Sequence, residues 1–544
     1  MLPSALDPGV SPWLAARVLV RSGLIRPVRP DKLLGMCLSL AQWRTTPAAA
    51  YAAAAAHVPD RLAVIDEHGA STFAEIDRRS SQVAAGLRRR GVVSGDRVAL
   101  LVRNSADFVV AEAALSKLGV DLVYLNTGAA PPQIADVLDR ERVVAVIADR
   151  EFADSLRAAA GERLVVLTGS GDDGRPTLAS LVEDTSRESG AAPLPPVARA
   201  GRHVIMTSGT TGRPKGAERE TPGGAAGIGS LVALLSAIPL RAREVTVLAA
   251  PMFHSWGFAN FTLSMVLETT LVLDRKFDPE RTLARVQEHR AQVLVAVPVM
   301  LQRILELPPE ARRRYDTSSL RVIAVSGSAV PVGLAERVRD EFGDVLYNLY
   351  GSTEVAAASV ATPEDMRVAP GSVGHPLSGV QVSILDGSGA PLPTGQSGRI
   401  FVGSSLAFRG YTGGGDKDRV GGLVATGDVG HLDRDGRLWV DGRDDEMIVS
   451  GGENVFPAEV EECLRAHPEV ADVAVVGVPD EKFGARLVAH VVFAGGASGA
   501  DGDALRDYVR QRLAGYKVPR DVVLHDELPR NETGKVVKRQ LTGP

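Results

Sequence analysis

The chain has 544 residues, of which 45% are apolar and 23% are charged, as in ordinary globular proteins. This length exceeds a single simple core and predicts a large enzyme built from several structural units. With 61 basic and 66 acidic residues the net charge is −5, which argues against a nucleic-acid partner.

Cysteine usage and the N-terminus bear on location. Cys37 and Cys463 are the two cysteines, too few for a disulfide framework, and we expect both to be small buried side chains in a reducing cytoplasm. The longest apolar runs, such as 293–301, are half as long as a membrane span, and no signal-peptide pattern opens the chain. The sequence therefore indicates a cytoplasmic protein.

The first 45 residues are interpreted as a peripheral helical extension. A helix is predicted over Trp13–Ser22, with Arg17 and Arg21 on one ridge. Two interpretations stay open: a helix packed on the body of the protein, and a weak contact with the inner face of a membrane.

The region that follows alternates between strand and helix patterns. An Ala-rich helix is predicted over 46–58 and another helix over 108–118. Strands are predicted over 98–102, 122–125, 143–148, 164–168, 245–249, 293–297 and 320–325. This alternation predicts parallel sheets covered by helices on both faces. The stretch 183–202, rich in Ser, Gly and Pro, is predicted to be a surface connector.

The pattern changes after Gly374. Short strands at 380–385 and 398–402, and a hairpin at Asp435–Gly436, predict a β-rich subdomain. The last hundred or so residues mix strands and helices as a small α+β domain does. We thus expect an α/β protein with an N-terminal domain over 1–442, a hinge over 443–446 and a mobile C-terminal domain over 447–544.

One segment combines hydroxyl side chains, glycines and a lysine directly after an apolar run. It reads Thr207-Ser208-Gly209-Thr210-Thr211-Gly212-Arg213-Pro214-Lys215-Gly216. Glycines let the backbone approach phosphate oxygens, while amide and hydroxyl groups donate hydrogen bonds. It is not a Walker A loop, because two residues separate Gly212 from Lys215. The segment therefore predicts a phosphate-binding loop.

With this loop, and with further motifs in the same order along most of its length, the chain resembles the adenylate-forming superfamily. That superfamily comprises acyl-CoA synthetases, peptide-synthetase adenylation domains and luciferases. The resemblance implies ATP, Mg²⁺ and coenzyme A as ligands. It also implies two steps: a carboxylate attacks the α-phosphate of ATP to give acyl-AMP and pyrophosphate, and the CoA thiol then takes the acyl group.

The second motif of the resemblance is Tyr350-Gly351-Ser352-Thr353-Glu354. The resemblance implies that Tyr350 and Gly351 lie against adenine, that Thr353 contacts the α-phosphate, and that Glu354 and Thr207 hold Mg²⁺. An aromatic face suits a base, and a carboxylate suits a hard cation.

Two further motifs concern the ribose and the hinge. By resemblance, Asp428 of Thr426-Gly427-Asp428 accepts hydrogen bonds from ribose hydroxyls, and Arg443 touches ribose and phosphate. Asp445 falls at the position about which the C-terminal domain rotates between the two half-reactions, and a polar linker suits such a hinge.

The C-terminal motifs serve the two half-reactions in turn. Lys535 is one of only nine lysines in an arginine-rich chain, and by resemblance it holds the acyl carboxylate against ATP. The loop Ser450-Gly451-Gly452-Glu453 resembles the one that lines the pantetheine tunnel in the second step.

The acyl site is expected around Pro251–Phe258. His254 resembles a gate at the carboxylate end of the pocket, and Gly327 and Ser328 belong to a small-residue loop between adenine and acyl group. The segment lacks the Arg or Asp that an amino-acid substrate would call for. Residues after the phosphate-binding loop resemble actinobacterial-type fatty-acid ligases. The expected substrate is therefore a medium- or long-chain fatty acid.

Three alternatives stay open: an acyl-AMP ligase that loads a separate carrier protein, a luciferase-like oxygenase, and a non-catalytic lipid-binding relative. The last would have lost some of the motif residues, and all of Lys215, Glu354, Asp428, Arg443 and Lys535 are present. Acyl chain length, and whether the protein is a monomer or a homodimer, are left open.

Overall fold

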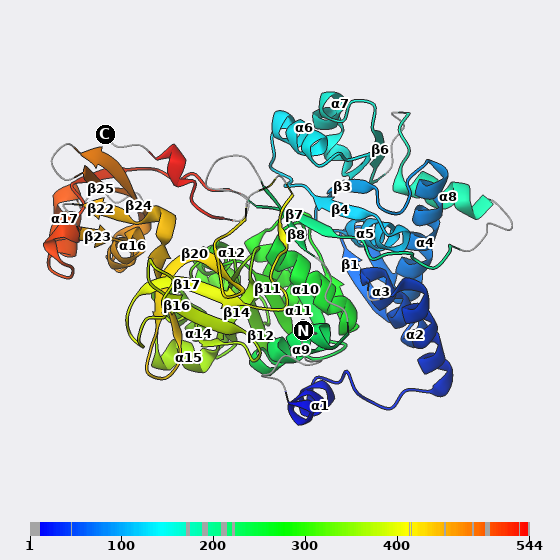
Figure 1. Ribbon diagram of the computed structural model, residues 1–544, viewed down its shortest axis with the longest axis horizontal. Coiled ribbons are helices and arrows are strands. Elements are labelled where there is room, and N and C mark those ends of the chain that lie inside the picture. Colours follow the sequence, from blue (N-terminus) through cyan, green and yellow to red (C-terminus); the bar gives the residue numbers. More distant parts are fainter. Residues whose placement is uncertain are drawn as a thin grey trace.

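The computed structural model describes residues 11–44, 46–169, 174–187, 194–207, 215–219, 224–412, 414, 416–450, 453–480, 484–494, 501–531 and 534–541. These residues form four β-sheets with helices packed around them (Figure 1). This is the expected α/β architecture, with mixed rather than purely parallel sheets.

The first sheet has nine strands, and its central members are parallel. In spatial order they are β15 (His375–Pro376), β14 (Ala356–Ala361), β13 (Leu346–Ser352), β12 (Val322–Val325), β11 (Val293–Ala296), β9 (Val245–Leu248), β10 (Thr270–Val272), β1 (Leu62–Asp66) and β2 (Gly69–Thr72).

The second sheet has seven strands, again parallel at its centre. Their order is β18 (Gly410–Tyr411), β8 (Lys215–Arg219), β7 (His203–Thr207), β4 (Asp121–Tyr124), β3 (Arg97–Leu101), β5 (Ala145–Ala148) and β6 (Leu164–Leu167).

Helices cover both faces of these sheets. They are α3 (Pro47–His57), α4 (Phe73–Arg89), α5 (Ala106–Leu118), α6 (Pro131–Arg140), α7 (Ala153–Ala159), α8 (Leu178–Arg187), α9 (Gly224–Ala237), α10 (Ser255–Val266), α11 (Pro279–Glu288), α12 (Pro298–Glu306), α13 (Pro309–Arg312), α14 (Val332–Phe342) and α15 (Pro363–Val368). The largest core contains residues of both sheets and of α3, α5 and α10, so it joins the two sheets through these helices. Residues 108–118 of α5 are buried without exception, as expected for a helix that is apolar all round.

The third sheet carries the predicted β-rich subdomain. Its antiparallel strands are β16 (Gln381–Leu385), β17 (Gly398–Gly403), β20 (Leu423–Leu432), β19 (Arg419–Val420) and β21 (Leu438–Arg443). The turn between β20 and β21 contains Asp435 and Gly436, where the hairpin was expected. Asp428 lies within the long strand β20 and not in a turn.

The fourth sheet belongs to the C-terminal region. It contains β23 (Glu453–Val455), β22 (Ile448–Ser450), β25 (Gly484–Phe493), β24 (Val470–Asp480) and β26 (Asp521–Leu524), with α16 (Pro457–Arg465) and α17 (Gly502–Arg510) packed on it. Figure 1 shows this unit beside the third sheet, with the C-terminal segment running back toward the centre of the molecule.

Two helices precede the body, α1 (Pro12–Arg21) and α2 (Pro30–Trp43). α1 contacts α9, the backbone of Ser22 accepts a hydrogen bond from Ala242 at 2.7 Å, and Arg26 pairs with Glu268 at 2.5 Å. The extension is thus held against the body. In the part of the chain that the structure describes, no helix is both long and apolar enough to cross a bilayer.

Two expectations were wrong. Residues 183–187 belong to helix α8 and not to a connector, because Leu178 and Leu181 anchor that helix in the core while its polar later residues face solvent. Cys37 is exposed rather than buried, because it lies on the outward face of α2. Cys463 is partly buried, and both thiols are free.

Glu112 of α5 is an unpaired carboxyl in the main core. Its side chain is fully buried, neither oxygen has a hydrogen-bond partner among the described residues, and burial raises its pKa to about 8. Between pH 4.5 and 8 the unfolded chain therefore binds fewer protons at this site than the folded chain. Glu112 thus lowers the free energy of unfolding as the pH rises through this window.

We predict that Glu112→Gln raises the melting temperature at pH 8 by several degrees relative to the native chain and changes it little at pH 5. Calorimetry at both values measures the difference, with the exposed Glu310→Gln as the control. An equal effect of Glu112→Gln at both pH values would contradict a titrating core carboxyl.

Candidate active site

One large cavity, of about 2130 Å³, lies where the sheets and the C-terminal segment meet. Its walls come from α2, α3, α9 and α10, from the β13–β14 turn, from β20 and β21, and from residues 531–539. One end is rich in charged side chains and the other is apolar. Most of the predicted site residues that the structure describes line the charged end.

The predicted phosphate-binding loop joins β7 to β8. Thr207 closes β7 and is paired with Lys215, the first residue of β8. Ser208, Gly209, Thr210, Thr211 and Gly212, together with the side chain of Thr207, lie outside the described residues. The ammonium of Lys215 lies 5.2 Å from the ring centre of Tyr411 and lines the cavity.

The second motif spans the end of β13 and the turn that follows it. At Gly351 a β-carbon would lie 1.8 Å from the carbonyl oxygen of Ala356, so only glycine lets β13 and β14 approach this closely. Thr353 in the turn shares a 2.9 Å hydrogen bond with Ser255, the first residue of α10. This contact joins the motif to the acyl segment.

Glu354 is a buried but ionised carboxylate. Burial tends to raise its pKa, but hydrogen bonds from Tyr411 and Ser352 outweigh burial, and the pKa is lowered. The Tyr411 hydroxyl donates to Oε1 at 2.7 Å. Among the described residues no cluster of three or more His, Cys, Asp or Glu could hold a metal alone. A single carboxylate suits a Mg²⁺ ion whose other ligands are phosphates and water.

Asp428 is held by Tyr350, which is 78 residues away in sequence, and by Arg443 on the neighbouring strand. The Tyr350 hydroxyl donates to one carboxylate oxygen at 2.5 Å, and the Arg443 guanidinium donates to the other at 3.3 Å. Burial raises the pKa of Asp428, and these two partners oppose the rise. Burial and Asp428 raise the pKa of Tyr350 well above its usual value. Asp428 and Arg443 are direct partners across β20 and β21.

Lys535 comes from the C-terminal segment and reaches the same end of the cavity. Its backbone amide is held by Asn531 Oδ1 at 2.9 Å. Removal of its ammonium from bulk water, and then the nearby Arg443, lower its pKa, while Asp428 and Glu354 raise it. The structure therefore brings Lys535 together with three of the residues that the resemblance assigned to the nucleotide site.

The predicted hinge is a short helical turn, Asp444–Glu446, directly after β21. The side chain of Asp445 lies outside the described residues. Glu446 forms an ion pair with Lys538 at 2.8 Å, and Lys538 also pairs with Glu461 at 3.0 Å. The segment that carries Lys535 is thus tied to the hinge.

The predicted pantetheine loop runs from Ser450, the last residue of β22, to Glu453, the first residue of β23. Ser450 and Glu453 are paired across this hairpin. Gly451 and Gly452, and the side chains of Ser450 and Glu453, lie outside the described residues.

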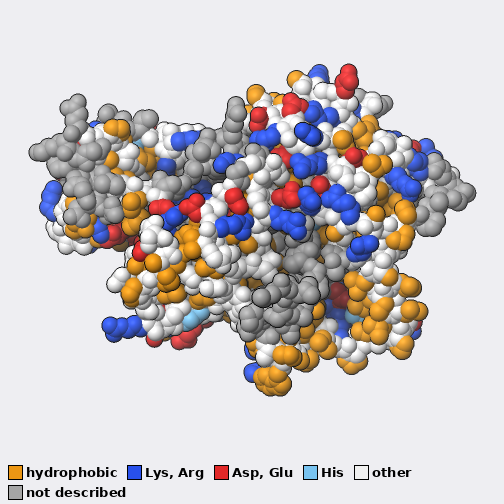
Figure 2. Space-filling view, in the orientation of Figure 1, with side chains coloured by type: hydrophobic (Ala, Val, Ile, Leu, Met, Phe, Trp, Pro, Cys, Tyr) orange, Lys and Arg blue, Asp and Glu red, His pale blue; other side chains and the backbone are white. Residues whose placement is uncertain are grey.

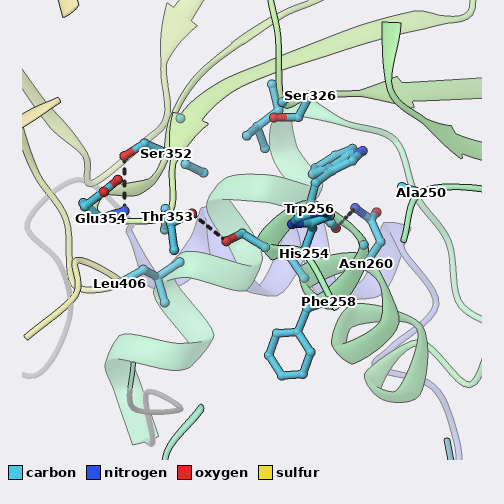
Figure 3. Close-up of a pocket in the computed structure, with 18 of the residues that line it drawn as sticks. Ala250, His254, Trp256, Phe258, Asn260, Ser326, Ser352, Thr353, Glu354 and Leu406 are labelled. Carbon is cyan, nitrogen blue, oxygen red and sulfur yellow. Dashed lines mark hydrogen bonds between the residues drawn. The ribbon is translucent and has the colours of Figure 1, made fainter. Parts of the chain in front are cut away.

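His254 is the residue that precedes α10, and it faces the cavity near Thr353 and Trp256 (Figure 3). Burial, and then Lys535, lower its pKa to about 4, so the imidazole is neutral near pH 7. Its buried Nε2 atom has no hydrogen-bond partner in the part of the chain described. An unpaired polar atom in a cavity wall is available to a substrate oxygen.

The small-residue loop lies opposite α10. Ser326, Gly327 and Ser328 all line the cavity, and Ser326 is buried (Figure 3). Gly327 has φ +98°, a conformation that a residue with a β-carbon rarely adopts.

Three further residues of the site were not predicted. Tyr411 and Lys417 line the charged end beside Glu354 and Asp428. Asn104 fixes the loop before His254, because its amide donates to the carbonyls of Leu248 and Ala250 and accepts from the Met252 amide at 2.8 Å. Asn104 and Tyr411 act through contacts between segments that no local pattern signals.

The comparisons with known proteins agree with this geometry. The model of the family "AMP-binding enzyme" matches residues 51–412, and the model "AMP-binding enzyme C-terminal domain" matches residues 459–535. A feruloyl-CoA synthase from Amycolatopsis sp is 36% identical over 493 residues, which are 89% of this chain and 96% of that protein. A fatty acid–[acyl-carrier-protein] ligase, ScoC of Streptomyces coeruleorubidus, is 30% identical over 498 residues, 90% and 94% of the two chains.

A solved structure shares the fold. The o-succinylbenzoate CoA synthetase of Bacillus subtilis, in complex with its acyl-adenylate intermediate, superposes with a TM-score of 0.79 at 28% identity. The match covers 91% of this chain and 98% of that one.

We predict that Tyr350 and Asp428 stabilise the fold as a coupled pair. Tyr350→Phe and Asp428→Asn are each expected to lower the free energy of unfolding, and the double variant to lower it by about 1–3 kcal/mol less than the sum. Urea unfolding followed by tryptophan fluorescence measures this, since all four tryptophans precede the hinge. Tyr347→Phe is the matched control, because its hydroxyl makes no hydrogen bond within the described residues. Strict additivity would contradict the pairing.

Proposed function

The chain belongs to the AMP-binding enzyme family, and we propose that its cavity joins a medium- or long-chain fatty acid to AMP and passes the acyl group to coenzyme A. Family membership makes it an AMP-forming acid–CoA ligase family enzyme that adenylates an acid with ATP. The observation that carries the fatty-acid assignment is one continuous cavity with ionic groups at one end and a long apolar wall at the other.

The apolar wall supports a chain longer than a single ring. It is built by small residues of α3 and larger ones of α9 and α10: Ala50, Ala53, Ala54, Leu231, Leu234, Leu263 and Val266. Glu268, the carboxylate among these residues, is offset by Arg26 and Arg243. Apolar walls gain from burying methylene groups, at roughly 0.8 kcal/mol each. The relative named as a feruloyl-CoA synthase indicates an aryl acid for that protein, and an aryl acid would fill only part of this wall.

The first step places the acid carboxylate between Lys535 and the α-phosphate of ATP. The carboxylate oxygen attacks phosphorus, the bond to the pyrophosphate oxygen breaks, and pyrophosphate leaves. This step brings together the negative charges of the acid carboxylate, the α-phosphate and the departing pyrophosphate. Catalysis therefore depends on positioning these groups and on neutralising their charge. Lys535 and Arg443 supply that charge from the protein. Neutral His254 adds no charge but offers its free Nε2 atom to a carboxylate oxygen.

Mg²⁺ fits this site as a partner of the phosphates. Glu354 would hold it, since its pKa is lowered and its carboxylate lines the cavity. Bound there, the ion would neutralise phosphate charge. Thr207, the second expected ligand, has a side chain outside the described residues.

The second step requires Lys535 to leave. A CoA thiolate attacks the acyl carbonyl carbon, AMP departs, and a thioester forms. Because the segment carrying Lys535 is linked to the hinge through Lys538 and Glu446, rotation about 443–446 would withdraw it. The turn after Ser450 would then enter in its place.

The test is mass spectrometry of products formed from ATP, Mg²⁺ and a ladder of saturated acids from acetate to stearate, with ferulate included. We expect acyl-AMP and pyrophosphate without CoA, acyl-CoA and AMP with it, and turnover that rises with chain length. Turnover of ferulate alone would overturn the fatty-acid assignment. Acyl-AMP that ignores CoA but is consumed by a holo acyl-carrier protein would establish the carrier-loading reaction.

A variant separates the two half-reactions. Lys535→Ala is expected to slow pyrophosphate formation by about 100-fold, the loss usual for one charge-stabilising donor. Conversion of supplied acyl-AMP and CoA to acyl-CoA should change less than fivefold. The exposed Lys276→Ala, outside the cavity, is the matched control. Equal loss in both half-reactions would show that Lys535 acts in both or only supports the fold.

A further inference from the structure

The apolar end of the cavity opens to solvent. Leu40 of α2, Ile228 of α9 and Val266 of α10 line the cavity, yet their exposed fractions are 50%, 48% and 43%. Residues that belong both to a cavity wall and to the surface mark its rim. The cavity therefore has a mouth between these three helices, on its apolar side.

The helix that forms one side of this mouth has an apolar face turned outward. Leu33, Leu34, Cys37, Leu38 and Ala41 recur at helical spacing on α2 and are all exposed. The leucines at 33, 34 and 38 are 51%, 61% and 60% exposed. A surface helix of a soluble protein normally turns its apolar stripe toward the core. This stripe faces away from the core and lies beside the mouth.

α1 and the linker extend this surface. Trp13, Val20 and Ile25 are 70%, 58% and 52% exposed, and the Arg17 guanidinium lies 5.5 Å from the Trp13 ring centre. Figure 2 shows hydrophobic side chains gathered over α1 and α2, both along the lower edge of the molecule. We call the exposed apolar and basic residues of α1, α2 and their linker the N-terminal surface.

The charge of this surface differs from that of the rest of the chain. Residues 11–44 contain six Lys or Arg and a single acidic residue, Asp31, whereas the whole chain has a net charge of −5. Arg17, Arg21 and Arg29 are exposed beside the apolar residues. Apolar side chains flanked by cations match the boundary of a bilayer with anionic headgroups. Pairing two copies through this surface would bring like charges together.

We propose that the N-terminal surface docks on an anionic lipid bilayer and sets the mouth of the acyl cavity at its surface, so that membrane-dissolved acids enter the cavity directly. The inference rests on the proposed function for its acyl substrate. The carboxylate of a membrane-dissolved acid lies at the bilayer surface, so it enters the mouth first and its alkyl chain follows along the apolar wall.

Vesicle flotation tests the docking without any catalysis. The native chain should float with vesicles of phosphatidylglycerol and phosphatidylcholine, weakly with phosphatidylcholine alone, and less as salt rises. Leu34→Glu/Leu38→Glu should reduce the floated fraction at least tenfold, and Arg17→Glu/Arg21→Glu should abolish the preference for anionic lipid. Leu524→Glu/Val368→Glu and Arg157→Glu are matched exposed controls elsewhere on the surface. Equal flotation of all variants would overturn the proposal.

Cys37 offers a direct probe of the contact. In Cys463→Ser it is the only cysteine, and it lies in the exposed apolar face of α2. An NBD label there should brighten severalfold and shift to the blue on anionic vesicles. A label on Ser186→Cys, in a Cys37→Ser/Cys463→Ser background, should not. If light scattering shows that Leu34→Glu/Leu38→Glu instead dissociates a lipid-free dimer, the surface binds a second copy and the proposal is wrong.

The link to the cavity is tested by how the acid is supplied. Leu34 and Leu38 do not line the cavity, so Leu34→Glu/Leu38→Glu should turn over water-soluble octanoate at the native rate. It should lose at least tenfold on palmitate held in anionic vesicles. Equal rates for both supplies would overturn direct entry. If no fatty acid is adenylated by the native chain, the proposed function fails, while flotation and labelling still decide the docking.

Discussion

The charged end of the cavity depends on the burial of one carboxylate, that of Asp428. A carboxylate that leaves water must be compensated by donors or cations, and this one is held by the Tyr350 hydroxyl on one oxygen and the Arg443 guanidinium on the other. The three residues come from the first sheet, from β20 and from the strand that enters the hinge. Asp428 therefore links the first sheet to the third at the charged end of the cavity.

The same end carries more cationic than anionic side chains. The cationic side chains that line it are Lys215, Lys417, Arg443, Lys535, Lys538 and Arg539, and the carboxylates are Asp428, Glu354, Asp416, Glu446 and Glu461. Glu446 and Glu461 are both paired with Lys538. Burial, and then the repulsion from the nearby Arg443, lower the pKa of Lys535. The phosphates of a bound nucleoside triphosphate would offset the repulsion between Lys535 and Arg443, and loss of pyrophosphate would restore part of that repulsion. The charge balance thus favours the Lys535 segment in the cleft before the first step and weakens its hold afterwards.

The sequence predicted those parts of the fold whose signal is local. Buried parallel strands such as Val98–Leu101 consist of unbroken apolar runs, and the hairpin at Asp435–Gly436 carries its own turn chemistry. Helix α8 was not predicted because its anchoring leucines, Leu178 and Leu181, precede the polar stretch that begins at residue 183. Cys37 was misplaced because composition predicts a buried cysteine, whereas the orientation of α2 decides its exposure.

The residues at the charged end of the site fall into the same two groups, those with a local sequence signal and those without one. Glu354, Asp428, Arg443 and Lys535 stand in motifs that resemblance identifies one by one. Tyr411 belongs to a two-residue strand, β18, whose only signal is its pairing with β8 almost 200 residues earlier, so nothing near it in sequence indicates that it would reach Glu354. Asn104 likewise fixes the loop before His254 from the segment between β3 and α5. Such residues become visible only when the chain is folded.

The two ends of the cavity differ in how far the bound substrate there can tolerate water. An acyl-adenylate is a mixed anhydride that water hydrolyses, so its carbonyl must be shielded from water. The Lys535 segment lines the cavity at the end where that carbonyl would lie. Water does not hydrolyse the alkyl chain, and burial of the chain at any point along the apolar wall is favourable. An open mouth at Leu40, Ile228 and Val266 therefore costs the reaction little, because a bound alkyl chain fills the passage between this mouth and the reactive carbonyl.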